Sequence, residues 1–142
     1  MPSIVRFAIP FLALLAAGCA RSPTVAPRSG AALPGRPPLF DLGRYHRKVT
    51  TDSAEAQRWF DQGLLSTYNF NHGEAVRSFE EASRLDPGCA MAWWGQAYAL
   101  GPNINAPMDS AAGVAAHASL ARAQALRAHG TELERALIVA LG

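Results

Sequence analysis

The sequence predicts an all-α fold built from stacked helical hairpins. When the chain is shifted by 34 residues, residues 59–63 fall on residues 93–97, so that tryptophan meets tryptophan and glutamine meets glutamine. Periods of this length are typical of arrays of stacked helix pairs. Capping residues and glycine or proline stops also divide the chain after residue 50 into five segments of helical length.

Each expected helix has its own start or stop signals. Three starts place a capping oxygen three residues before a carboxylate, as in a capping box: Asp52 with Glu55, Asn71 with Glu74, and Thr131 with Glu134. Glycine and proline end three helices, at Asp86-Pro87-Gly88, at Gly101-Pro102 and at Gly130. We therefore expect helices at 53–70, 73–85, 90–100, 110–128 and 132–141.

The helices group into two repeat units, 56–89 and 90–128, followed by a partial hairpin at 131–142. One helical face carries a stripe that returns 41 residues later, as Ala75, Phe79, Ala82 and then Ala116, Leu120, Ala123. This offset exceeds the period by seven residues. The extra residues fall in or beside 101–109, where two prolines and a glycine prevent a continuing helix.

This pattern resembles the tetratricopeptide repeat. The matching positions are Trp59, Gly63, Ala75, Phe79, Ala82 and Pro87 in the first unit, and Trp93, Ala97, Ala116, Leu120 and Ala123 in the second. The resemblance implies an α-solenoid of antiparallel hairpins whose concave groove binds a protein or peptide. The sequence departs from the family at Gln62, Ser66 and Phe70, where the family favours Leu, Tyr and Gly.

Residues 41–108 also resemble a subgroup of bacterial repeat proteins. The shared motifs are WFDQGL at 59–64, FNH at 70–72, DPGCAMAWWG at 86–95 and GPNINAPM at 101–108. Members of this subgroup are much longer and have no settled activity. The resemblance is consistent with an amino-terminal piece of a longer protein.

Residues 1–18 resemble the signal peptide of a bacterial lipoprotein. Arg6 precedes an apolar run at 7–17, which is shorter than the roughly 20 residues that span a bilayer. Ala16-Ala17-Gly18 before Cys19 is similar to a lipobox, which implies acyl chains such as palmitate on Cys19. The repeat domain would then lie outside the cytoplasm, anchored to the cell membrane or outer membrane. The alternative is an ordinary secretory signal with an incidental cysteine.

Residues 19–48 are expected to form a flexible basic tether. They are rich in Pro, Gly, Ser, Ala and Arg and have no periodicity. Residues 20–48 carry six Lys or Arg against one Asp, whereas residues 49–142 carry six Arg against ten acidic residues. A basic arm gains roughly 1 kcal/mol per cation near an anionic membrane, or it serves only to keep a linker soluble. The acidic body argues against nucleic-acid binding.

We expect no catalytic site, metal site or cofactor. The four histidines lack the spacing of a zinc site: His46, His72, His117 and His129. The carboxylate pairs Glu80 with Glu81, and Glu132 with Glu134, fit solvated faces and caps better than acid–base catalysis. Cys89 is either a small packing residue or a thiol whose pKa a helix amino terminus lowers.

The candidate partner-binding loop is the insertion, with Asn103, Asn105 and Asp109, because insertions in repeat arrays often bind. Its alternative role is a lid that packs Ile104 and Met108 on the core. Residues 68–72 form an aromatic and polar corner that is also consistent with a simple turn.

These patterns predict a membrane-anchored scaffold for protein–protein interaction in the bacterial cell envelope. One alternative is the amino-terminal recruitment module of a longer envelope enzyme or transport component, and another is a small-molecule binder at residues 103–109. The last helix ends apolar, so we expect an exposed edge that further sequence, a partner or a second copy covers, the last giving a homo-oligomer.

Overall fold

The structure is a computed structural model that describes residues 39–105 and 107–142. These residues contain no β-strand and form α1 (Ala54–Tyr68), α2 (His72–Leu85), α3 (Ala90–Leu100), α4 (Ser110–Leu126), a 3-10 turn (Arg127–His129) and α5 (Glu132–Leu141). The all-α prediction is confirmed, and each helix lies within two residues of its expected range. The expected signal peptide, Cys19 and the tether before residue 39 lie outside the described residues.

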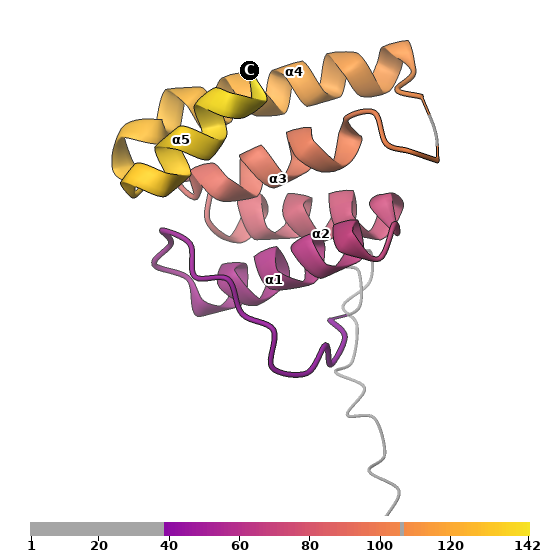
Figure 1. Cartoon of the computed structure of the whole chain (residues 1–142). Coiled ribbons are helices and arrows are strands. Elements are labelled where there is room, and N and C mark those ends of the chain that lie inside the picture. The colour runs from indigo at the N-terminus through magenta and orange to yellow at the C-terminus, as the bar shows by residue number, and fades with distance from the viewer. Residues whose placement is uncertain (1–38, 106) are drawn as a thin grey trace, which may run out of the picture.

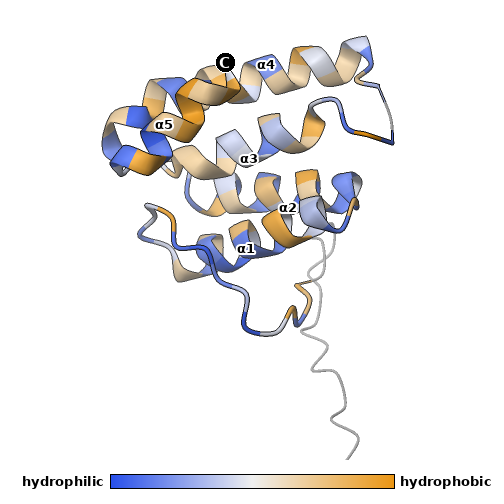
Figure 2. Ribbon diagram, in the orientation of Figure 1, coloured by the Kyte–Doolittle hydropathy of each residue, from blue (hydrophilic) through white to orange (hydrophobic). Residues whose placement is uncertain are grey.

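The helices are layered in chain order (Figure 1). Each of α1 to α4 packs against the next, and α5 contacts both α3 and α4. The first helices of successive hairpins also touch, because α1 contacts α3 and α3 contacts α5. Figure 2 shows a largely hydrophilic segment before α1 and an α5 that begins with hydrophilic residues and continues with apolar ones. None of the helices described is long and apolar enough to cross a membrane.

Phe79 on α2 fills the centre of the core, where it is fully buried. Its ring lies 5.5 Å from the ring of Phe60, measured between centroids. Gly63 on α1 and Gly95 on α3 flank it: a Cβ on Gly63 would stand 2.7 Å from the ring, and one on Gly95 would overlap it. The two glycines therefore allow three successive helices to close around one aromatic side chain.

Buried glutamines mark the repeat inside the structure. Gln62 Nε2 donates to Ser78 Oγ (3.1 Å), and Ser119 Oγ donates to Gln96 Oε1 (3.3 Å). Gln96 follows Gln62 by 34 residues and Ser119 follows Ser78 by 41, which are the two offsets seen in the sequence. Each unit thus pairs a first-helix glutamine with a second-helix serine, although the donor differs. Gln62, which stands where the family favours Leu, is therefore a buried polar side chain whose hydrogen bonds are satisfied.

The helix starts differ from the expectation in two places. Ser53 caps α1, not Asp52, and accepts the N–H of Ala56 (3.1 Å). The Thr51 hydroxyl accepts the N–H of Ser53, so the chain turns into the helix one residue later than predicted.

At α2, Asn71 is the cap as predicted. Glu74 instead bonds Gln62 and Arg77, so no reciprocal bond to the cap forms there. The box at Thr131 and Glu134 is complete.

Residues 39–51, here called the strap, lie along α1 and reach the start of α5 (Figure 1). The tether was expected to extend to residue 48, but the hydrogen bonds to the helical body begin at Phe40. The Phe40 N–H donates to Gln62 Oε1 (2.7 Å), and the Arg47 N–H donates to Asp61 Oδ1 (2.9 Å). These polar contacts leave no periodic signal in the sequence.

Glu134 joins the strap to α5. Thr50 donates to its carboxylate through the N–H (2.7 Å) and the hydroxyl (2.6 Å), and the Thr131 N–H donates as well (2.6 Å). Burial on its own raises the pKa of this carboxyl, but the hydrogen bonds from Thr50 and Thr131 outweigh burial and leave the pKa of Glu134 lowered.

The contribution of Glu134 to stability should therefore depend on pH. Its pKa is lower in the folded chain than the ordinary 4.5, so the stabilisation is complete above that value and is lost as the pH falls through the folded value. We expect Glu134→Gln to lower the free energy of unfolding by about 1–2 kcal/mol at pH 7. The difference from wild type should narrow as the pH falls below 4.5. Urea titrations across this range measure it.

The matched control is Glu132→Gln, which removes an exposed carboxylate from the same first turn. It should lose only the weaker interaction with the helix amino terminus. A Glu134→Gln effect that stays constant down to pH 3 would contradict the assignment.

Candidate functional site

A groove lies where α1 gives way to α2, opposite the end of α3. It encloses about 360 Å³. We call it the corner groove, and its lining residues are Thr67, Tyr68, Phe70, His72, Tyr98, Pro102, Asn103 and Ile104.

The corner groove brings together two segments that the sequence analysis considered separately. One is the turn at residues 68–72 and the other is the insertion after α3. They meet because α1 packs against α3, so the carboxyl ends of these two helices lie near each other. Sequence reasoning missed Tyr98, whose ring stacks on Trp94 at 5.1 Å between centroids. A tyrosine about one turn before the glycine stop was the available signal in the sequence.

Phe70 has a backbone conformation that disfavours it. Its φ is 60°, in the left-handed region where glycine is the usual residue. Two backbone bonds hold this turn: the Phe70 N–H donates to Thr67 O (3.0 Å), and the Asn71 N–H donates to Ser66 O (2.8 Å). Burial does not compensate for the strain, because 60% of the Phe70 surface is exposed. An exposed aromatic residue in a strained turn is typical of a functional position.

The groove presents an unusually apolar rim. Tyr68 is 56% exposed and Ile104 is 89% exposed. The alternative of a lid that packs Ile104 and Met108 on the core is therefore wrong, since Met108 is also exposed. The reason is local, because Asn103 Oδ1 accepts the N–H of Asn105 (2.9 Å) and forms a turn at the loop tip.

His72 forms the inner wall of the groove at the first residue of α2. Its ring lies edge-on to Phe70, with 6.5 Å between centroids. Within residues 39–105 and 107–142 neither ring nitrogen has a hydrogen-bond partner, and both are buried. A buried unsatisfied imidazole is costly and is another unusual feature at this corner.

The three candidate loop residues have different positions. Asn103 lines the groove, Asn105 contributes its backbone N–H to the loop turn, and Asp109 caps α4 by accepting the N–H of Ala112 (2.7 Å). Asn103 is thus the one among them that a ligand in the groove would contact.

The other polar candidates have structural surroundings. Cys89 is buried, and burial raises the pKa of its thiol to about 11, which favours the packing role. Glu81 is buried and pairs with Arg84 (2.7 Å) rather than lying on a solvated face. His46 pairs with Asp61 (2.9 Å). In the described ranges no group of three potential ligand side chains is placed to hold a metal ion.

The fold and the groove define an all-α protein of the helical repeat-like class. No protein-family model, curated protein or solved structure matches the chain.

Proposed function

We propose that this chain is a tetratricopeptide-like scaffold that binds a protein partner through the corner groove. The repeat interpretation is supported by the equivalent pairs Gln62 with Ser78 and Gln96 with Ser119. The proposal keeps Cys19 as the site of acylation, which anchors the scaffold to a membrane of the bacterial envelope. It assigns no catalytic role to the described residues.

Phe70 carries the proposal. A left-handed conformation costs a residue other than glycine about 1–2 kcal/mol, and most of the Phe70 surface stays exposed. Association would supply that burial. A partner covering Phe70 would remove apolar area from water, which is the main favourable term in protein association.

The groove chemistry favours an apolar or aromatic side chain of the partner. Tyr68, Phe70 and Tyr98 supply aromatic walls, and Asn103 supplies an amide at the rim. Aromatic rings pack edge to face or offset, so one planar side chain fits between such walls. A volume of about 360 Å³ accommodates one or two side chains, not a large cofactor.

The alternative function is the recruitment module of a longer envelope enzyme or transport component. The same groove would then dock the client of that protein. Additional repeats or a catalytic domain in the downstream reading frame would favour this alternative.

The experiment places a photo-cross-linking amino acid at Ile104 of the full chain in its native host. We expect a discrete cross-linked product in the membrane fraction and none from the same probe at Glu80, an exposed position on α2. Phe70→Gly should raise the free energy of unfolding by about 1 kcal/mol, because it relieves the left-handed strain. It should also weaken the cross-link at Ile104 several-fold.

Two outcomes would contradict the proposal. An undiminished cross-link in Phe70→Gly would mean that the aromatic wall does not bind the partner. If a Cys19→Ala chain stays in the membrane fraction, Cys19 is not the membrane anchor. That result would not bear on binding at the corner groove.

A further inference from the structure

The strap is held mainly through its backbone. The Gln57 side chain forms two such bonds, donating from Nε2 to Arg47 O (2.8 Å) and accepting the Val49 N–H at Oε1 (3.0 Å). Glu134 accepts the Thr50 N–H, as described above. One glutamine side chain thus pairs with an extended segment as a neighbouring strand would, through one carbonyl and one N–H.

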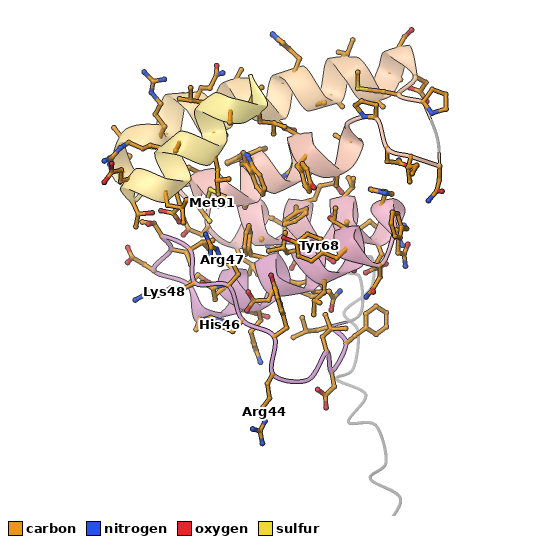
Figure 3. The ribbon with its side chains drawn as sticks, viewed as in Figure 1. Arg44, His46, Arg47, Lys48, Tyr68 and Met91 are labelled. Carbon is orange, nitrogen blue, oxygen red and sulfur yellow. The ribbon has the colours of Figure 1, made fainter. Side chains whose placement is uncertain are left out.

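The strap side chains contribute unequally to this contact, and Leu39, Leu42 and Tyr45 are 36–39% exposed. Val49 is buried in the core, whereas Arg44, Arg47 and Lys48 are exposed. Figure 3 shows Arg44 and Lys48 pointing away from the helices. Val49 is thus the one buried apolar side chain of the strap. Hydrogen bonds from strap side chains to acidic residues supplement it: His46 with Asp61, Thr50 with Glu134 and Thr51 with Asp86.

The surface beneath the strap belongs to the first helices of the hairpins. Gln57 and Asp61 lie on α1 and Glu134 on α5, and the anchor end of the strap lies beside Met91 of α3. The side chains that receive the strap are acidic or amide, and the strap is basic between residues 44 and 48. The cationic ends of Arg44 and Lys48 point away from this surface, so its acidic and amide groups are matched by N–H and hydroxyl donors of the strap.

We propose that this face of α1, α3 and α5 is a second binding surface, a groove for an extended peptide, and that the strap occupies it in cis. The partner that fits is an extended segment with free backbone N–H groups, followed by one β-branched residue and threonine. The residues that receive the strap backbone, Gln57, Asp61 and Glu134, are not among those that line the corner groove, so the proposal goes beyond the proposed function. A partner gains access by replacing the strap and making the same backbone hydrogen bonds in its place.

The test measures binding of a labelled synthetic peptide of residues 39–51 to the purified full chain by fluorescence anisotropy. The wild-type chain should bind it weakly, because the attached strap competes at a high effective concentration. Val49→Ser removes the anchor and should tighten peptide binding at least tenfold. Lys48→Ser, which removes an exposed side chain from the adjacent position, should behave as wild type.

A second substitution locates the bound peptide. Adding Gln57→Ala to Val49→Ser should reverse the gain at least tenfold, because Gln57 contacts the peptide backbone twice. Peptide binding that is indifferent to Gln57→Ala would place the peptide elsewhere and overturn the proposal.

A third variant of the full chain is used if circular dichroism shows that Val49→Ser does not fold. A protease site inserted between Thr51 and Asp52 of the full chain separates the strap after folding. Labelled peptide should then exchange into the cleaved chain and not into the uncleaved one. A folded, cleaved chain that takes up no peptide would overturn the proposal, whatever the outcome at the corner groove.

Discussion

Replacing Gly95 with alanine is expected to destabilise the chain by about 3 kcal/mol, the upper end of overpacking effects. The new methyl group would overlap the ring of Phe79, and Gly63 confines that ring from the opposite helix. Phe79 is fully buried, so the ring has no free space to enter. Relief requires α3 to move away from α2, which would disturb the central contact of the stack.

Denaturant unfolding of the purified chain measures this effect. The control is Gly73→Ala, since a Cβ at Gly73 would meet nothing closer than 3.9 Å. This control should be neutral or slightly stabilising, because alanine is the better helix former. Adding Phe79→Leu to Gly95→Ala should recover part of the loss through a positive coupling. Equal stabilities for the two glycine variants would refute the close packing at Phe79.

Replacing Ile138 with alanine is expected to cost about 3 kcal/mol and to loosen α5. Ile138 is a fully buried side chain of α5 within the shared core. Beyond apolar packing, α5 is attached by Trp94, whose Nε1 donates to Leu137 O (3.1 Å), and by the Thr50 bonds to Glu134. Loss of the apolar anchor leaves those polar contacts exposed to water.

Val139 provides the matched control, because it follows Ile138 directly and is 59% exposed. Val139→Ala should change stability by less than about 0.5 kcal/mol. Hydrogen exchange distinguishes local from global loss: in Ile138→Ala the amides of α5 should exchange much faster than those of α2. Equal effects of the two substitutions would mean that α5 is not docked on α3 and α4.

The exposed side chain of Val139 belongs to the apolar edge that was expected at the last helix. Leu133 and Val114 are exposed as well, whereas Ile138 is buried. The final layer therefore shows apolar side chains in the described structure, as the composition of α5 indicated. What covers this edge stays a prediction.

Sequence reasoning succeeded where the signal was periodic or local. Helix ends followed from capping residues and from glycine and proline stops. The offsets of 34 and 41 residues reappear as the pairs of Gln62 with Ser78 and Gln96 with Ser119. Among the aromatic residues of the repeat pattern, Trp59 and Phe79 are buried, whereas Trp93 is partly buried.

The strap escaped prediction because its contacts are polar, non-periodic and distant in sequence. Thr50 bonds Glu134 across 84 residues, and no pattern within the strap announces that partner. The predicted cap at Asp52 was wrong for a related reason: the Thr51 hydroxyl accepts the N–H of Ser53, a detail that helix propensities do not describe.

The corner groove was predicted only in pieces. Both the aromatic turn and the insertion were candidates, but their meeting depends on how α1 packs against α3. Phe70 was visible as a departure from glycine, whereas its positive φ and its exposed ring required the structure.

The strap also limits how far the helical body can lie from a membrane anchor at Cys19. If Cys19 is the membrane anchor, as proposed, residues 20–38 can place the helical body at most about 65 Å from the bilayer while the strap is bound. Displacing residues 39–51 would add up to about 45 Å to that reach. Occupation of the α1 face by another peptide would then let the body move farther from the membrane. Replacement of the strap would thus change both the bound peptide and the distance of the scaffold from the bilayer.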